Sequence, residues 1–139
     1  MHVEKVILLI DDDKDDLQML KDALKIIDRE HQVIEGSDGL DALKTLELSI
    51  SQQKLPCLIV LDVNMPRLDG KQTFLAIKSN KNLSHIPIVI FSTSTNLMDR
   101  TFFERNNTAY FIKPVKFAEF ASTASKMMNA CYHSSSKEW

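Results

Sequence analysis

The sequence predicts an α/β fold in which a doubly wound, five-stranded parallel sheet is covered by five helices. Short apolar runs, rich in β-branched and aromatic residues, recur about every 25 residues and favour strands. Segments with helical periodicity fill the intervals between these runs. Strand and helix therefore alternate five times, which is typical of a parallel sheet with helices on both faces.

The predicted strands are short, with four or five residues each. They cover residues 6–10, 32–35, 57–61, 88–91 and 109–112. The predicted helices show apolar residues spaced by three or four positions. Their markers are Leu17, Leu20, Leu24 and Ile27; Leu40, Leu43 and Leu46; Phe74, Leu75 and Ile77; Leu97, Met98 and Phe102; and Phe117, Phe120, Ala121, Ala124 and Met128.

Length and composition fit one globular domain. The chain has 139 residues, of which 44% are hydrophobic and 26% charged. We expect the domain to cover residues 1–133, followed by a short polar tail over 134–139. The net charge of -2 gives no general electrostatic case for binding nucleic acid or an anionic membrane. No apolar stretch approaches the roughly 18 residues of a membrane span, and the N-terminal residues lack a signal-peptide pattern.

The two cysteines, Cys57 and Cys131, lie far apart in the sequence and in apolar surroundings. Free cysteines of this kind behave as small buried hydrophobic residues. We therefore expect both to be reduced thiols rather than a disulfide. Reduced thiols are consistent with a cytoplasmic location.

Polar residues follow four of the predicted strands. In an open parallel sheet, ligands bind outside the carboxyl ends of the strands, so these residues are expected to share one crevice. They are Asp11 and Asp12 after the first strand, Asp62 and then Asn64 after the third, Ser92 and Thr93 after the fourth, and Lys113 after the fifth.

This combination of groups predicts metal-dependent phosphate chemistry. Three neighbouring carboxylates raise one another's pKa, and a divalent cation relieves their repulsion. Oxygen ligands favour a hard ion such as Mg²⁺, whereas the four histidines are scattered and form no zinc motif. The Lys113 ammonium and the cation would offset charge on phosphoryl oxygens. The Asp62 carboxylate is a candidate nucleophile that would form an acyl phosphate.

Four motifs resemble the receiver domain of bacterial two-component response regulators. They are ILLIDDD (7–13), LIVLDVNMPRLDG (58–70), PIVIFST (87–93) and AYFIKP (109–114). The resemblance runs from about residue 4 to residue 132. It is strongest to single-domain receivers of the phytochrome-associated and chemotaxis-like kind. It implies a flavodoxin-like fold with strand order 2-1-3-4-5, an order that is taken from the family.

The resemblance also implies a role for each matching residue. Asp62 matches the phosphoacceptor, Lys113 the lysine that pairs with phosphate, Ser92 the switch hydroxyl, and Tyr110 the switch aromatic. The metal positions match Asp12 as a direct ligand, Asp11 acting through water, Asp62 itself, and Asn64 through its backbone carbonyl. Asn64 and Ser94 match positions that tune the rate of phosphate loss.

The function implied is that of a stand-alone response regulator in a phosphorelay. A histidine kinase or phosphotransfer protein would phosphorylate Asp62 with Mg²⁺. The surface of the fourth helix, fifth strand and fifth helix would then change and bind a downstream protein, and the domain would dephosphorylate itself. It would not be a turnover enzyme. It would have no DNA-binding domain and no membrane segment, and homodimerisation is left open.

The sequence departs from the family pattern at two places. Ser92 stands where many members have threonine, and the hydroxyl needed for switching is kept. The segment RNNTA (105–109) replaces a glycine-bearing turn, so Asn106 or Asn107 is expected to adopt the left-handed conformation.

Several residues have a simpler structural explanation. Asp13, Asp15 and Asp16 are expected to cap a helix and occupy its first turn rather than bind metal. Thr93 is an alternative to Ser92 as the switch hydroxyl, and Tyr110 is an alternative core residue. Asp69 and Gly70 are expected to form a turn.

Other functions remain as alternatives. A pseudo-receiver would be an interaction module with a silent site, but it would not need the full set of polar residues. An aspartyl phosphohydrolase usually has a second carboxylate two positions after its nucleophile, where this chain has Asn64. Dinucleotide or nucleotide binding is disfavoured because no glycine-rich phosphate loop follows the first strand.

Overall fold

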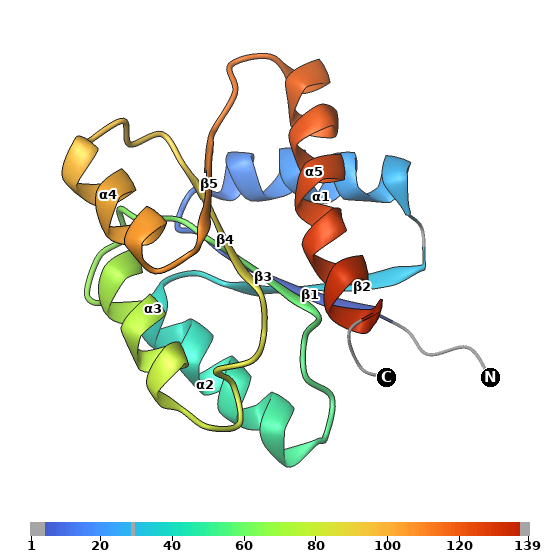
Figure 1. The fold of residues 1–139 in the computed structure, drawn as a ribbon. Coiled ribbons are helices and arrows are strands. Elements are labelled where there is room, and N and C mark those ends of the chain that lie inside the picture. Colours follow the sequence, from blue (N-terminus) through green and yellow to red (C-terminus); the bar gives the residue numbers. More distant parts are fainter. Residues whose placement is uncertain (1–4, 29, 137–139) are drawn as a thin grey trace.

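The computed structural model describes residues 5–28 and 30–136, and it confirms the predicted doubly wound α/β fold (Figure 1). Five strands form one sheet in the order β2-β1-β3-β4-β5, and every neighbouring pair is parallel. The strands are β1 (Lys5–Ile10), β2 (His31–Gly36), β3 (Leu58–Leu61), β4 (Ile88–Ser92) and β5 (Ala109–Ile112). Each strand lies where its apolar run was predicted. The inner strands β1, β3 and β4 are buried along nearly their whole length, whereas the edge strands β2 and β5 are partly exposed.

Helices cover both faces of the sheet (Figure 1). They are α1 (Lys14–Ile27), α2 (Gly39–Ser51), α3 (Gly70–Ser79), α4 (Leu97–Arg105) and α5 (Phe117–Ser136). α1 and α5 pack together on one face, and α2, α3 and α4 lie on the other. Among the described residues, no helix is long and apolar enough to cross a membrane.

Alternation along the strands builds one apolar cluster on each face, because successive side chains point to opposite sides. Ile7 and Leu9 of β1 join the cluster beneath α1 and α5, whereas Leu8 and Ile10 join the cluster beneath α2, α3 and α4. All four side chains are at most 1% exposed. Full burial of one such side chain contributes about 1.5–3 kcal/mol. The two clusters hold the strands rigidly, so the residues that follow the strands are fixed in place.

Three helices, α1, α2 and α3, begin with the side-chain caps expected of aspartate. Asp13 caps α1 and accepts hydrogen bonds from the backbone N–H groups of Asp15 and Asp16, as predicted. Asp69 and Gly70 were expected to form a turn, but they begin α3 instead. Asp69 is the N-cap of a capping box with Gln72.

Gly70 lets α3 start directly beside the end of β3. A Cβ atom at this position would collide with the carbonyl oxygen of Asp62 and the Cα atom of Val63. Glycine has no Cβ, so its backbone N–H can donate to the Val63 carbonyl oxygen at 2.8 Å. The loop that carries Asp62 is thereby held against the N-terminus of α3.

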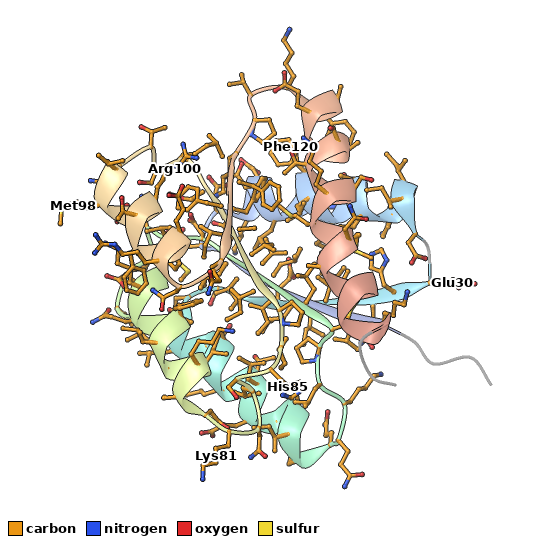
Figure 2. The ribbon with its side chains drawn as sticks, viewed as in Figure 1. Glu30, Lys81, His85, Met98, Arg100 and Phe120 are labelled. Atoms are coloured by element: carbon orange, nitrogen blue, oxygen red, sulfur yellow. A yellow bond between two sulfur atoms is a disulfide. The ribbon has the colours of Figure 1, made fainter. Side chains whose placement is uncertain are left out.

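The predicted apolar stripe on α4 is wrong in detail. Leu97 and Met98 were expected to mark the buried face, yet they are 77% and 76% exposed. Figure 2 shows Met98 at the outer edge of the helix. The buried residue is Phe103, whose ring meets the edge of Phe74 at 5.4 Å between centroids. Both exposed residues lie in the first turn of α4, directly after the N-cap Asn96.

The turn before β5 confirms the expected left-handed residue. Asn107 has a φ of 56°, whereas Asn106 has a φ of -97° and ends α4 as its C-cap. Asparagine tolerates the left-handed region better than most residues because its short polar side chain can bond locally. Asn107 therefore takes the left-handed position at which the family usually has glycine.

The cysteine prediction is wrong, because Cys57 and Cys131 form a disulfide in the structure. Cys57 directly precedes the central strand β3, and Cys131 lies on α5, which packs across that strand. Their Cα atoms are 5.2 Å apart, within the usual range for a disulfide, although 74 positions separate them in sequence. The prediction rested on sequence distance and apolar surroundings, and neither reports which elements pack together.

α5 extends into the region of the predicted polar tail, which covers residues 134–139. α5 continues through Ser136, so the first three residues of the predicted 134–139 tail are helical. Residues 137–139 lie outside the described residues.

Candidate functional site

Strand register brings Asp11 and Asp62 side by side. Ile10 of β1 pairs with Leu61 of β3, so the next residue on each strand reaches the same edge of the sheet. Backbone hydrogen bonds extend this pairing: Asp62 N–H donates to the Ile10 carbonyl oxygen, and Asp11 N–H donates to the Gly36 carbonyl oxygen, each at 3.0 Å. The carboxylates are therefore positioned by the sheet itself.

Asp12 completes a group of three carboxylates at this edge. Ligand oxygens of Asp11, Asp12 and Asp62 all lie within 4.8 Å of one another. Asp11 and Asp62 are buried, whereas Asp12 is exposed and leaves the group open to solvent. A set of carboxylate oxygens with solvent access is the chemistry that Mg²⁺ requires, because this ion keeps several of its waters. The residues present therefore fit a hard divalent cation.

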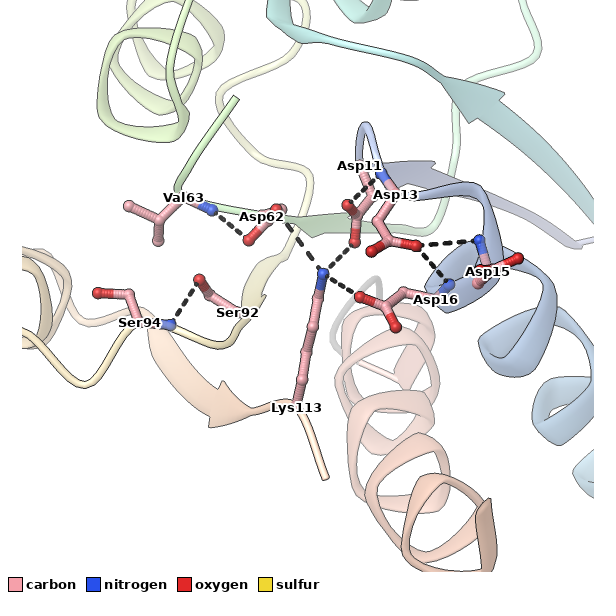
Figure 3. A network of polar contacts seen from close by, with 9 residues as sticks. All are labelled: Asp11, Asp13, Asp15, Asp16, Asp62, Val63, Ser92, Ser94 and Lys113. Carbon is pink, nitrogen blue, oxygen red and sulfur yellow. Dashed lines mark hydrogen bonds and ion pairs between the residues drawn. The ribbon is translucent and has the colours of Figure 1, made fainter. Parts of the chain in front are cut away.

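Lys113 reaches the carboxylates from the end of β5. Its backbone N–H donates to the Ser92 carbonyl oxygen at 2.8 Å, which continues the pairing of β5 with β4. Its Nζ atom lies 2.6 Å from Asp11, 2.8 Å from Asp16 and 3.7 Å from Asp62, and the side chain is only 5% exposed (Figure 3). One buried ammonium thus faces three carboxylates.

Burial and the repulsion between carboxylates shift the pKa values of the site residues. The pKa of Asp11 is raised to about 6, first by burial and then by the charge of Asp62, with hydrogen bonding to Lys113 opposing the rise. Burial also raises the pKa of Asp62, against the opposing effects of Lys113, Ser92 and the Val63 N–H. For Lys113 burial lowers the pKa, but contacts with Asp11 and Asp16 outweigh it and the pKa is raised. Lys113 alone therefore does not neutralise the cluster, and a divalent cation would.

The raised pKa of Asp11 predicts pH-dependent binding of Mg²⁺. A divalent cation would bind the ionised carboxylate, so protons would compete with it below about pH 6. At pH 5 roughly one tenth of the Asp11 carboxyl remains ionised, so we expect affinity about tenfold weaker than at pH 7. Isothermal titration calorimetry at pH 5 and pH 7 measures the affinity for Mg²⁺. An affinity unchanged between pH 7 and pH 5 would contradict the electrostatic description.

Burial distinguishes Ser92 from Thr93 as the candidate switch hydroxyl. Ser92 is fully buried at the end of β4 and its hydroxyl accepts a hydrogen bond from the Ser94 N–H at 3.1 Å, whereas Thr93 is exposed. The Ser94 hydroxyl in turn donates to Asp99 of α4 at 2.8 Å. Of the two hydroxyls, that of Ser92 is therefore the one inside the site.

Tyr110 connects β5 to the same loop. Its hydroxyl donates to the Ser94 carbonyl oxygen at 2.8 Å, and its half-buried ring packs beside Phe103 and beneath the Arg100 guanidinium. Asn64 lies exposed on the loop after β3. The structure thus gathers Asp11, Asp12, Asp62, Ser92 and Lys113 at one edge, with Tyr110 linked to them through the β4–α4 loop.

Asp16 is a site residue that the sequence analysis missed. It lies in the first turn of α1 as predicted, but its carboxylate accepts a hydrogen bond from Lys113, 97 positions away. Helical side chains point back toward the helix N-terminus, so a first-turn aspartate after β1 faces the strand ends. This direction of first-turn side chains was the sequence signal that could have placed Asp16 in the site.

The fold and the site together define a class: doubly wound α/β domains with an acidic, lysine-containing crevice at the carboxyl edge of the sheet. Residues 7–125 match the family model of the response regulator receiver domain. The chain belongs to this family, whose members are phosphorylated by histidine kinases.

Similar proteins of known sequence and structure agree with this assignment. The chain is 38% identical over 94 residues to response regulator Rcp1 of Synechocystis sp., a match covering 66% of this chain and 64% of Rcp1. The crystal structure of the phosphorylated cyanobacterial phytochrome response regulator RcpA superposes with a TM-score of 0.83 at 28% identity, covering 91% of this chain and 93% of RcpA. The crystal structure of the Mn²⁺-bound form of Rcp1 superposes with a TM-score of 0.79 at 30% identity, covering 90% of this chain and 92% of the Rcp1 chain.

The match to some relatives covers only part of their length. The chain spans 49% of the transcriptional regulatory protein PrrA of Mycobacterium tuberculosis, to which it is 30% identical over 123 residues. It spans 8% of histidine kinase P4 of Formosa agariphila at 31% identity. The shared unit is thus the receiver domain.

Proposed function

We propose that this chain is a response regulator receiver that accepts a phosphoryl group on Asp62 from a histidine kinase or phosphotransfer protein. The observation that carries the proposal is the buried Asp62 carboxylate, which lies within 4.8 Å of Asp11 and Asp12 and faces the Lys113 ammonium. Family membership supports the same chemistry.

Asp62 would act as the nucleophile. One carboxylate oxygen attacks the phosphorus of the donor, the P–N bond of a phosphohistidine breaks, and an acyl phosphate forms on Asp62. Asp11, Asp12, Asp62 and the backbone carbonyl of Asn64 would hold Mg²⁺. When bound, the cation would offset negative charge on the phosphoryl oxygens. Lys113 would offset further charge, because its Nζ already lies 3.7 Å from Asp62.

Phosphorylation would change the surface formed by α4, β5 and α5. The Ser92 hydroxyl, which accepts a hydrogen bond from Ser94 N–H, would donate its own proton in a hydrogen bond to the phosphoryl group. The Tyr110 hydroxyl donates a hydrogen bond to the Ser94 carbonyl oxygen. Movement of the loop that contains Ser94 would break this bond and release the tyrosine. The exposed apolar residues on and next to this surface support binding to another protein. These residues are Leu97, Met98, Ile112, Val115 and Phe117. The downstream partner would be a protein, with homodimerisation as the alternative.

The domain would promote only its own phosphorylation and dephosphorylation, without turning over a substrate. We propose a cytoplasmic location, where kinase partners would act. The Cys57–Cys131 disulfide of the structure would there be exposed to cytoplasmic reductants. The 5.2 Å Cα separation lets the bond form upon oxidation without backbone movement.

The test is phosphorylation by a small donor. Purified protein is mixed with acetyl phosphate and Mg²⁺, and intact mass spectrometry is expected to show the gain of one phosphate, which a chelator prevents. Absence of any gain at saturating Mg²⁺ would favour a silent pseudo-receiver. Steady hydrolysis of p-nitrophenyl phosphate would instead favour a phosphohydrolase, and none is expected.

A further inference from the structure

The ammonium of Lys113 is held by two short contacts and one longer one. Its Nζ lies 2.6 Å from Asp11 Oδ2 and 2.8 Å from Asp16 Oδ2, both within hydrogen-bonding distance, and 3.7 Å from Asp62 Oδ2. A lysine ammonium has three N–H donors. Two are therefore used by Asp11 and Asp16, and the third is left for the Asp62 side of the crevice (Figure 3).

The gap between Lys113 and Asp62 suits a larger group on Asp62. At 3.7 Å the third donor is too far for a hydrogen bond to the bare carboxylate. A phosphoryl group on Asp62 would extend its oxygens beyond the carboxylate and shorten this gap. An ammonium fixed by two anchors would meet those oxygens without first reorganising, which is the arrangement that favours charge stabilisation during transfer.

Asp16 differs from the other carboxylates around Lys113. Asp11 and Asp62 belong to the three carboxylates that fit a cation, whereas Asp16 does not. The backbone of Asp16 is itself fixed, since its N–H donates to the Asp13 cap at 3.1 Å. Its side chain is 20% exposed. Asp16 is therefore an anchor that remains available to Lys113 while the other carboxylates serve the cation and the phosphoryl group.

We propose that Asp16 is a positioning residue, which fixes the Lys113 ammonium so that its third N–H meets the phosphoryl group on Asp62. This inference rests on the proposed phosphorylation of Asp62. Asp16 acts through Lys113 and does not touch the reacting atoms. It extends the site from the strand ends to the first turn of α1.

The test compares Asp16→Asn with Asp15→Asn. Asp15 precedes Asp16 in the same helical turn, is exposed, and loses the same charge when replaced, so it controls for net charge and for the helix terminus. At saturating Mg²⁺ and acetyl phosphate, we expect Asp16→Asn to lower the initial labelling rate roughly tenfold. Asp15→Asn should stay within about twofold of the wild type, and Asp16→Glu, which restores a carboxylate, within about threefold.

A second readout concerns Lys113 in the metal-free, unphosphorylated protein. Nitrogen-detected NMR of the Lys113 ammonium is expected to show faster proton exchange with water in Asp16→Asn than in Asp15→Asn, because one anchor is lost. A merely structural role for Asp16 would leave this exchange unchanged. Thermal unfolding of each variant verifies that it is folded.

The outcomes separate this inference from the function on which it rests. Equal labelling rates, or equal ammonium exchange, for Asp16→Asn and Asp15→Asn would overturn the positioning role alone. Failure of the wild-type protein to take up phosphate would overturn the proposed function and the positioning role together.

Discussion

Replacing Asp62 with asparagine is expected to abolish phosphate uptake from acetyl phosphate in the presence of Mg²⁺. The amide has nearly the shape of the carboxylate, but it lacks the negative oxygen that attacks phosphorus. Burial raises the pKa of the Asp62 carboxyl, which means that the buried charge is unfavourable. The amide removes this charge, so the metal-free variant should be at least as thermally stable as the wild type. Loss of labelling would then not be due to unfolding.

Asp69→Asn is the matched control for this substitution. Asp69 lies on the same loop and caps α3, and asparagine serves equally well as an N-cap. The control should take up phosphate at the wild-type rate. Intact mass spectrometry of both variants decides the matter, and a full phosphate gain in Asp62→Asn would show that the acceptor lies elsewhere.

Reduction of the Cys57–Cys131 bond is expected to produce the largest change in stability. The bond joins residues separated by 74 positions, and closing a loop of this length restricts the unfolded chain strongly. A disulfide typically contributes about 2–4 kcal/mol, which for a domain of this size corresponds to a fall in Tm of roughly 10 °C. The expected result is lower Tm with reductant than without.

The control is the double variant Cys57→Ala with Cys131→Ala. Its Tm should not respond to reductant, which separates the bond from other effects of the reagent. Alanine avoids placing a hydroxyl in the apolar surroundings of Cys131, which is fully buried. Identical Tm values for the oxidised and reduced wild-type protein would mean that the bond does not constrain the fold. Because Cys131 lies on α5, the bond also ties the proposed output surface to the centre of the sheet.

The fold was predictable because its signal is local. Each strand was marked by a short run of strand-forming residues, and four of the runs, those of β1, β3, β4 and β5, are followed at the same edge by polar residues of the site. Asp11, Asp62 and Lys113 could therefore be placed together once a parallel sheet was inferred, since parallel strands all end at one edge. Capping by Asp13 was equally local, because an N-cap depends on the next two or three residues.

The features that escaped prediction depend on packing between distant elements. Leu97 and Met98 fit a helical stripe, but which face of α4 is covered depends on how the helix sits over the sheet. The Cys57–Cys131 bond requires α5 to cross β3, and the ion pair between Asp16 and Lys113 requires the start of α1 to face the end of β5. Periodicity assigns a residue to an element, and it does not say which distant side chain that residue meets.

Locating the phosphorylated residue tests the central claim most directly. Borohydride reduces an acyl phosphate to the alcohol, which converts a phosphorylated aspartate to homoserine, and tryptic peptides of the reduced protein can then be sequenced by mass spectrometry. The peptide spanning residues 55–67 contains Asp62 as its only acidic side chain, whereas Asp11, Asp12 and Asp16 fall in other peptides. We predict homoserine at position 62 after treatment with Mg²⁺ and acetyl phosphate. Homoserine in the peptides of residues 6–21, with none at position 62, would contradict the assignment of Asp62 as the phosphoacceptor.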